Sequence, residues 1–325
     1  MQSTRRNFLT GAGVLAAAVA AKLPMQSFAQ AMSIKTPFRL AVINDEISQD
    51  FDHACHVAAV EFGLNWIELR GMWGKNITNL DAQEIAESKR ILAKYHLRVT
   101  DIASPLFKVD WPGATPAHEA SKQPSFGADF NFEQQDALLG KCIDLAKTFG
   151  TNRIRCFDFS RLKDQKPYRA AMDDKLRKAA AVCAKSNLIL LLENEMSCNT
   201  ATGAESARVL AAIPAKNFML NWDPGNAAAA GSTPYPNGYD LLPKDRIGHC
   251  HCKDVVRKPD GKYTWAPVGS GIIDWVGQFQ AFMRQGYHYG VSLETHWRGA
   301  GTPEASTRES MAGLKAVLKK AGALS

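Results

Sequence analysis

Apolar and polar positions alternate between two periods along almost the whole chain. Eight short apolar runs have the length and composition of buried strands: 38–43, 66–69, 98–103, 153–157, 188–193, 218–222, 247–252 and 290–294. Longer segments between them place apolar residues at every third or fourth position, as in a helix that buries one face: 51–62, 82–95, 133–149, 168–186, 204–213, 274–285 and 304–321. This alternation predicts a parallel sheet covered by helices.

Eight such repeats favour closure of the sheet into a (β/α)8 TIM barrel, a fold of about 250 residues. The alternative is an open doubly wound sheet, but no GxGxxG-type turn follows the first predicted strand. No Ser- or Gly-rich linker interrupts the repeats, so we expect a single α/β domain over residues 32–325. One connection, 104–131, is unusually long and punctuated by prolines, which is typical of a functional lid or a disordered insertion.

Residues 1–31 have the features of a cleavable export signal. Arg5 and Arg6 precede the weakly apolar run 11–21, and residues 29–31 have the small-x-small pattern that a signal peptidase needs. The paired arginines favour a twin-arginine signal over an ordinary secretion signal. We therefore expect an exported, periplasmic protein. The apolar run is shorter than the roughly 20 residues that span a bilayer, so we expect no stable membrane anchor after cleavage.

Composition places the chain among globular proteins, since 46% of its 325 residues are hydrophobic. The formal charge is +7, and removal of residues 1–31 leaves 36 basic and 32 acidic residues, or +4. Such a mild excess, without a basic cluster, gives no reason to expect a nucleic-acid partner. The seven cysteines are an odd number and form no CxxC pair, so we expect no disulfide framework.

The stretch His249-Cys250-His251-Cys252-Lys253 carries the clearest sign of chemistry. Side chains alternate along a strand, so His249, His251 and Lys253 share one face and the two cysteines point to the other. A single histidine here would most often be a hydrogen-bonded core residue. Two imidazoles on one face at the end of a strand are more typical of a metal site.

Three other apolar runs also end in an acidic residue, namely Glu193, Asp223 and Glu294. With His251 they stand 30, 28 and 43 residues apart, and one βα repeat takes about 30 residues or more. The four therefore fall at equivalent strand ends, and the C-terminal ends of the strands form the active site of a barrel. Each has an ordinary alternative as a solvated strand end or a turn residue. Together they predict one site.

Three carboxylates and one imidazole form a hard set of ligands. This set is typical of Mn²⁺, Mg²⁺, Co²⁺ or Fe²⁺, with Zn²⁺ as an alternative. A structural zinc site would have more cysteine or histidine ligands. We expect one divalent ion as the cofactor.

Five short motifs follow one another in the second half of the chain: Leu192-Glu193-Asn194, Trp222-Asp223-Pro224-Gly225-Asn226, His249-x-His251-x-Lys253-Asp254, Gly269-x-Gly271-x-Ile273-Asp274-Trp275 and Leu293-Glu294. In this order they resemble the xylose isomerase-like TIM barrel superfamily. The similarity is greatest to its sugar isomerase and epimerase branch, which includes ketose 3-epimerases and inosose dehydratase. The resemblance covers about residues 38–320.

The resemblance implies a metal ion with four ligands: Glu193, Asp223, His251 and Glu294. It also implies that Glu193 and Glu294 transfer protons during catalysis. Arg257 stands where the ketose epimerases carry an arginine near the substrate. Asn226 stands where many of them have a histidine, and this departure leaves the substrate open.

Further residues at strand ends, or in the loops that follow, are predicted to bind substrate beside Asn226 and Arg257: Glu68, Trp111, His249 and His296. Lys253 is predicted to stabilise negative charge during catalysis, with a structural ion pair to Asp254 as an equal alternative. Trp73, Trp265 and Trp297 also fall in such loops. An indole there can stack on a sugar ring, although packing is its commoner role.

This set of residues suits enolisation of a sugar. A metal polarises a ketose carbonyl, one carboxylate removes the α-proton, and a second carboxylate returns a proton. Return to the opposite face gives epimerisation, return to the adjacent carbon gives isomerisation, and loss of a β-hydroxyl gives dehydration. We expect a metal-dependent isomerase or epimerase of an unphosphorylated keto-sugar or related polyol. A lyase acting on a keto-sugar or 3-keto-glycoside is the alternative.

Two other classes fit the residues less well. An endonuclease-type phosphodiesterase would need more histidine ligands and a basic face, and a sugar-binding barrel without catalysis would not need the complete set of ligands. The expected partner is a small sugar. Related barrels often form homo-oligomers, but the sequence shows no interface.

Overall fold

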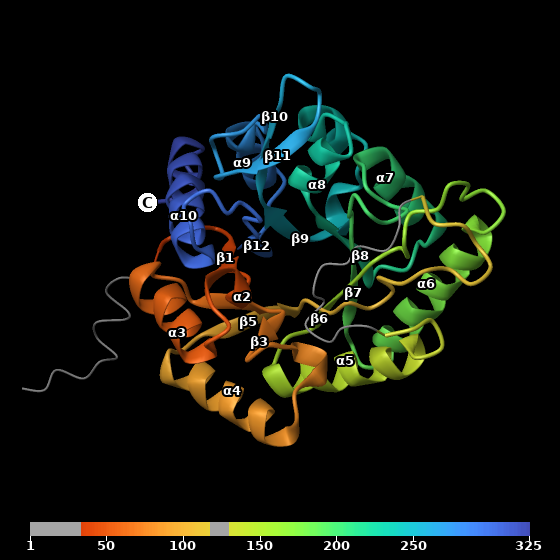
Figure 1. The fold of residues 1–325 in the computed structure, drawn as a ribbon, viewed down its shortest axis with the longest axis horizontal. Helices are drawn as coiled ribbons and strands as arrows, with labels where there is room; N and C mark the ends of the chain where they lie inside the picture. The colour runs from red at the N-terminus through yellow and green to blue at the C-terminus, as the bar shows by residue number, and fades with distance from the viewer. Residues whose placement is uncertain (1–33, 118–129) are drawn as a thin grey trace, which may run out of the picture.

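Eight parallel strands run through the middle of the molecule and close into a barrel (Figure 1). The computed structural model describes residues 34–117 and 130–325. Its barrel strands, in chain order, are β1 (Arg39–Val42), β2 (Trp66–Leu69), β5 (Arg98–Ile102), β6 (Arg153–Cys156), β7 (Ile189–Glu193), β8 (Phe218–Trp222), β9 (Ile247–Cys252) and β12 (Gly290–Leu293). The predicted single-domain (β/α)8 barrel is confirmed.

Hydrogen bonds join the strands in the order β1-β12-β9-β8-β7-β6-β5-β2. The barrel closes between β1 and β2, where an isolated parallel bridge pairs Ile43 with Glu68. Every position of β8 and β9 is buried. Such complete burial is expected when helices cover the outer face of parallel strands and side chains fill the interior.

Helices form a ring around the barrel in Figure 1. The longer ones are α3 (Phe51–His56) with its continuation η1 (Val57–Glu61), α4 (Ala82–Lys94), α5 (Gln135–Phe149), α6 (Arg169–Ala184), α7 (Gly203–Ala212), α9 (Trp275–Arg284) and α10 (Pro303–Lys320). Shorter helical segments are α2 (Asn44–Ile47), η2 (Ile77–Asn79), α8 (Pro224–Ala229), η3 (Pro234–Gly238) and η4 (Lys244–Arg246). All seven predicted helices are present.

Local sequence signals determine several helix ends. Asp81 and Glu84 form a capping box at the start of α4, and Thr202 and Glu205 form another at α7. The segment after β8, which the pattern predicts as a loop, begins with the short helix α8. Pro224 occupies its first turn, where the missing N–H has no cost.

Two antiparallel hairpins extend from the strand ends. One pairs β3 (Gly71–Met72) with β4 (Lys75–Asn76), and the other pairs β10 (Asp254–Arg257) with β11 (Tyr263–Ala266). The second hairpin follows the histidine strand β9 directly. It therefore stands at the C-terminal end of the barrel, where active sites of this fold lie.

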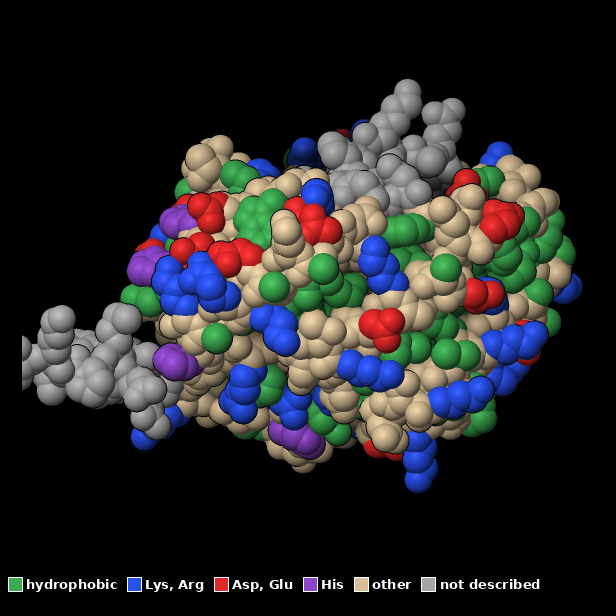
Figure 2. Space-filling model, turned by 90° about the horizontal axis from the view of Figure 1, so that it is seen from below, with side chains coloured by type: hydrophobic (Ala, Val, Ile, Leu, Met, Phe, Trp, Pro, Cys, Tyr) green, Lys and Arg blue, Asp and Glu red, His purple; other side chains and the backbone are tan. Residues whose placement is uncertain are grey.

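The surface and the core agree with a globular chain of mild charge. Figure 2 shows one face, on which Lys and Arg side chains are scattered among acidic, apolar and uncharged ones. All seven cysteines are buried and unpaired. No helix within residues 34–117 and 130–325 is long and apolar enough to cross a membrane. The predicted export signal, residues 1–31, lies outside the described residues, as does 118–129 of the long connection.

Candidate active site

The four predicted metal ligands come together at one end of the barrel. Glu193 ends β7, Asp223 directly follows β8, His251 lies in β9, and Glu294 directly follows β12. These four strands are consecutive neighbours in the barrel, although β12 follows β9 only after the second hairpin and α9. One ligand atom from each residue lies within 4.8 Å of those of the other three, and all four side chains are buried.

His251 stands at the centre of the cluster. Its Nε2 lies 3.0 Å from Glu68 Oε1, and its Nδ1 faces three carboxylates. The distances from Nδ1 are 3.2 Å to Glu294 Oε2, 3.5 Å to Glu193 Oε1 and 3.8 Å to Asp223 Oδ2. Burial favours the neutral imidazole, but the carboxylates of Glu68, Glu193 and Glu294 outweigh it and raise the pKa of His251 well above its ordinary value. With Nε2 directed at Glu68, Nδ1 is the nitrogen that could bind a cation in exchange for its proton, as in carboxylate–histidine–metal arrangements.

Orphaned polar atoms support a cation at this point. Glu193 Oε2, Asp223 Oδ2 and His251 Nδ1 are buried and have no hydrogen-bond partner. Arg155 and Lys253 approach the two carboxylate oxygens as ion pairs, at 3.2 and 2.9 Å, but without hydrogen-bond geometry. Buried polar atoms are normally satisfied, so three unsatisfied atoms on three predicted ligands fit a group that could hold a cation. The oxygen-rich donor set also suits a divalent cation.

Lys253 is fully buried beside the cluster. Its Nζ lies 2.9 Å from Asp223 Oδ2 and 2.5 Å from Glu294 Oε2. Burial favours the neutral amine, but the carboxylates of Asp223 and Glu294 outweigh it and raise the pKa of Lys253 above its ordinary value. The side chain therefore stays a cation. The predicted ion pair with Asp254 is not the one that forms.

The carboxylates differ in their protonation. Burial favours their neutral forms, yet His251 and Arg155 hold the pKa of Glu193 below its ordinary value. Lys253 above all outweighs burial at Glu294 and holds its pKa well below the ordinary range. At Asp223 burial prevails and raises the pKa to about 6, in spite of the attraction of Lys253. Both glutamates are therefore ionised at neutral pH and able to accept a proton.

Glu68 and His249 lie in the barrel interior behind the cluster. Glu68 Oε2 is 3.1 Å from His249 Nε2, so this one carboxylate bridges His249 and His251. His249 Nδ1 in turn lies 3.7 Å from Asp101 Oδ1. All of these side chains are fully buried. They lie on the Nε2 side of His251, away from Glu193, Asp223 and Glu294, whereas the sequence predicts substrate contacts for Glu68 and His249.

Asn226 and His296 touch the predicted catalytic glutamates. Asn226 Nδ2 donates to Glu193 Oε1 at 3.2 Å, and its backbone N–H donates to Asp223 Oδ1, which caps α8. His296 Nε2 lies 3.2 Å from Glu294 Oε1 and is partly exposed. Its backbone has φ of 50°, a left-handed conformation that is rare outside glycine and often marks functional sites.

The structure does not bring Arg257 and Trp111 to the cluster. Arg257 is exposed on β10 and lies over the ring of Tyr263. Trp111 packs edge-on against Phe132 and Phe159, with ring centroids 5.2 and 4.8 Å apart. Arg257 lies five residues beyond the end of β9, because the chain continues from Cys252 into the hairpin and Arg257 is the last residue of β10.

Arg70 is the site residue that the sequence did not reveal. It follows β2, and its guanidinium reaches Glu294 Oε1 at 2.6 Å and Glu46 Oε1 at 2.8 Å, with Asp45 on its third edge. The three carboxylates outweigh burial and raise the pKa of Arg70. The sequence did offer one signal for a cation here, because Asp45 and Glu46 follow β1. In a closed barrel β1 borders β12, which Glu294 follows, so three carboxylates gather around one point.

Asp254 explains the glycine-containing motif that follows the hairpin. Its carboxylate accepts backbone N–H groups of Gly269, Gly271 and Ile273 at 2.9, 3.2 and 3.3 Å. A Cβ atom at Gly271 would collide with that carboxylate. The motif is therefore a structural device that anchors the turn between β11 and α9.

Comparison with known proteins agrees with the barrel fold. The family model described as "Xylose isomerase-like TIM barrel" matches residues 57–317. No curated protein matches the chain.

Solved structures share the fold at low sequence identity. A probable 3-DHS dehydratase, AsbF from Bacillus anthracis, is 19% identical with a TM-score of 0.62, over 86% of this chain and 98% of that one. The IOLI protein with a bound zinc atom is 15% identical with a TM-score of 0.65, over 87% and 99%. A D-allulose 3-epimerase from Methylomonas sp. is 18% identical with a TM-score of 0.62, over 89% and 99%.

Proposed function

Because the chain belongs to the xylose isomerase-like TIM barrel family, we propose that it is a divalent-metal-dependent enzyme that enolises an unphosphorylated keto-sugar or related polyol. The observation that carries the proposal is the convergence of Glu193, Asp223 and Glu294 on His251 Nδ1 in a buried cluster. Glu68 behind His251 supports it, because such a carboxylate orients a metal-binding imidazole.

Four residues would hold the ion: Glu193, Asp223, His251 and Glu294. When bound, the ion would act as a Lewis acid that polarises the substrate carbonyl. The orphaned atoms of three of these residues support this assignment. A zinc-containing neighbour of the same fold keeps Zn²⁺ beside Mg²⁺, Mn²⁺, Co²⁺ and Fe²⁺ as candidates.

Proton transfer falls to Glu193 and Glu294. They extend from β7 and β12, two strands that are separated by β8 and β9, so they approach the centre from different sides. Both are ionised, and one would remove the α-proton while the other returns it. Arg155 and Arg70 each hold one of the glutamates in place through an ion pair.

Lys253 would stabilise the developing charge. It remains an ammonium group because two carboxylates surround it, so it serves as a fixed positive charge and not as a base. A preorganised cation in a buried site stabilises an oxyanion far more than it would in water.

The outcome of enolisation separates two candidate activities. Return of the proton gives an isomerase or epimerase, and the D-allulose 3-epimerase of the same fold favours this activity. Loss of a β-hydroxyl gives a lyase, and the dehydratase of the same fold favours that one. His296, an imidazole at the mouth next to Glu294, is placed to protonate a departing hydroxyl.

Deuterium exchange tests the proposal directly. The metal-loaded protein is incubated in D₂O with ketoses, inososes and 3-keto-glycosides, and the masses of the products are measured by mass spectrometry. Deuterium at the carbon next to the carbonyl is the expected result. A product that differs only by one deuterium in place of one hydrogen indicates an isomerase or epimerase, and a product that has lost water indicates a lyase.

Two variants tie the exchange to the site. Glu193→Gln and Glu294→Gln should each lower exchange by at least about a hundredfold, the usual contribution of a positioned acid or base. Glu309→Gln, on the exposed face of α10, is the matched control. Full exchange in either site variant would remove that glutamate from the mechanism, and no exchange with any sugar would refute the proposed activity.

A further inference from the structure

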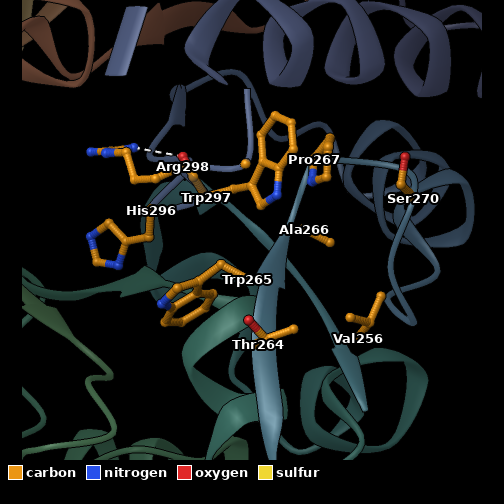
Figure 3. A pocket seen from close by; sticks show the side chains of 10 residues that line it. Val256, Thr264, Trp265, Ala266, Pro267, Ser270, His296, Trp297 and Arg298 are labelled. Atoms are coloured by element: carbon orange, nitrogen blue, oxygen red, sulfur yellow. Dashed lines mark hydrogen bonds between the residues drawn. The ribbon is translucent and has the colours of Figure 1, made fainter. Parts of the chain in front are cut away.

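A pocket opens beside the four predicted metal ligands, between hairpin β10–β11 and the segment after β12 (Figure 3). It is an open depression of about 640 Å³, a volume within the range of small-molecule sites. Its lining residues are Val256, Thr264, Trp265, Ala266, Pro267, Ser270, His296, Trp297, Arg298 and Gly299. The proposed mechanism uses only His296 of these.

His296 connects the pocket with the reaction centre. On one side its Nε2 lies 3.2 Å from Glu294 Oε1. On the other side its ring meets the ring of Trp265 edge to face, with centroids 5.2 Å apart. The Lys253 ammonium also lies 5.4 Å from the centroid of Trp265. A group attached to a substrate at the centre would therefore enter the pocket past these side chains.

The lining suits an uncharged ring. Figure 3 shows the indole of Trp265 next to His296 and that of Trp297 next to Pro267, and both indoles line the same space. Aromatic faces pack against the C–H face of a sugar or against another aromatic ring. Thr264 and Ser270 add hydroxyl groups that can donate and accept hydrogen bonds.

The one arginine of the lining is already engaged. Arg298 Nη2 lies 3.0 Å from Glu46 Oε2, and Arg298 Nη1 donates to the carbonyl of Trp297 at 2.8 Å. No carboxylate lines the pocket. A phosphate or carboxylate group would therefore have to share this guanidinium with Glu46, which favours a neutral ligand.

Both walls are held in place. The hairpin carries four cross-strand pairs, from Asp254 with Ala266 to Arg257 with Tyr263. Opposite it, the indole of Trp297 lies against Gly299, where a Cβ atom would collide with the ring. The pocket is therefore formed before a ligand arrives, which lowers the entropic cost of binding.

We propose that this pocket binds a second, uncharged ring attached to the reacting sugar, so that the substrate is a keto-glycoside and not a free ketose. This inference rests on the proposed function for the reacting sugar itself. The pocket only binds and positions the attached ring, whereas Glu193 and Glu294 transfer the proton.

Three β-linked substrates test it: methyl 3-keto-glucoside, which has no second ring, phenyl 3-keto-glucoside, and 3-keto-cellobiose with the ketone on the non-reducing ring. Deuterium exchange gives kcat/KM for each. A ring-bearing compound should exceed the methyl glycoside by about tenfold, the scale of one good aromatic contact. Preference for the phenyl or the sugar ring then shows which kind of ring the pocket takes.

Two variants assign the preference to the pocket. Trp297→Ala removes one wall, and Ser270→Trp fills the space from an exposed position. Both should abolish the preference while exchange of the methyl glycoside remains. Ser186→Trp, in the turn before β7 at the opposite end of the barrel, is the control and should keep the preference. Equal kcat/KM for all three substrates, or a preference unchanged in both pocket variants, would overturn the proposal.

A binding measurement separates this proposal from the proposed activity. If no sugar exchanges deuterium, cellobiose and glucose are titrated against tryptophan fluorescence and by calorimetry. Tighter binding of cellobiose, lost in Trp297→Ala and Ser270→Trp, would support the ring site even though enolisation had failed. No binding of cellobiose, or binding that both variants retain, would refute the ring site.

Discussion

At the scale of single residues, the site depends on side chains that orient other side chains. Glu68 is not one of the four predicted ligands, yet its contact with His251 Nε2 leaves Nδ1 to face the carboxylates. Arg70 and Arg155 play the same part for the two glutamates. Oriented ligands of this kind are what give a metal site its affinity, because loose ones must be ordered on binding.

Glu68→Gln should weaken metal binding about 10- to 100-fold, since an amide is a poorer acceptor for the His251 N–H and can also donate to it. Titration with Mn²⁺ or Zn²⁺, followed by calorimetry, measures the change. Glu309→Gln, an exposed glutamate, should leave the affinity unaltered. An unchanged affinity in Glu68→Gln would show that His251 does not rely on this carboxylate.

Metal affinity should also depend on the protonation of Asp223, whose pKa is raised to about 6 mainly by burial. The ligand must be deprotonated to bind, so below pH about 6 the ion has to displace a proton. His251 must lose a proton as well, because the carboxylates of Glu68, Glu193 and Glu294 outweigh burial and raise its pKa well above the ordinary value. The dissociation constant should therefore rise with acidity above pH about 6, and more steeply below it, where Asp223 adds a second proton. Asp223→Asn should bind more weakly but lose this step. A flat profile from pH 5 to 7 in the unaltered protein would contradict the assignment.

At the scale of elements, turn and cap residues position the strands that carry the site. Asp223 illustrates both roles, since one carboxylate oxygen caps α8 and the other faces the cluster. Asp254 anchors the turn after the hairpin, and so fixes the wall that carries Trp265. Local geometry and site geometry are thus built from the same side chains.

Helix α5 offers a matched pair of glycines. Gly140 is exposed within the helix and has open space where a Cβ atom would lie, so Gly140→Ala should stabilise the protein by about 0.5–1 kcal/mol. Gly150 ends the helix with φ of 69°, so Gly150→Ala should destabilise it by roughly 1–2 kcal/mol. Urea unfolding of both variants measures the effects. The same sign in both would contradict this account.

At the scale of the whole molecule, one end of the barrel carries the candidate site and the other carries contacts that stabilise the fold. The C-terminal ends of the strands carry the cluster and the pocket. At the N-terminal ends, a chain of stacked rings and guanidinium groups crosses several strands: Arg98 over Trp66 at 4.0 Å, Arg39 over Trp66 at 4.9 Å and Arg153 over Tyr289 at 4.5 Å. Substitutions at the N-terminal end of the barrel are therefore expected to change stability and to leave activity unchanged.

Trp66→Ala should therefore lower the free energy of unfolding by about 1–2 kcal/mol, because it removes two cation–π contacts worth about 0.5–1 kcal/mol each. Metal affinity and deuterium exchange should not change, because Trp66 lies at the N-terminal end of β2 and the cluster lies at the C-terminal ends of its strands. Urea unfolding and metal titration on one preparation check both statements. Loss of metal binding in a folded Trp66→Ala protein would show coupling between the two ends.

Barrel closure limited what could be predicted about the first two strands. Only one backbone bridge, Ile43 with Glu68, joins β1 and β2 in the described barrel, and side chains complete the seam. Asn44 accepts the Arg70 N–H at 2.9 Å, and the Arg70 guanidinium extends from that seam to Glu294. A contact between residues 224 positions apart follows from the closed ring of strands and from no local pattern.

The amino-acid sequence by itself determined the eight repeats and the strand-end positions of Glu193, Asp223, His251 and Glu294. Both depend on local physics, because periodicity records which face of an element is buried and parity records which face a side chain takes. The short helix α8 was not predicted because its six residues, three of them Ala, are too few to show a helical period.

Tertiary structure alone decided which side chains from distant repeats meet. It brought Arg70 and Glu46 to Glu294, placed Glu68 behind His251, left Arg257 and Trp111 apart from the cluster, and formed the pocket between the hairpin and the segment after β12. The physical reason is that closure of the barrel sets the order and tilt of the strands together. Distances across its mouth are therefore a property of the whole ring.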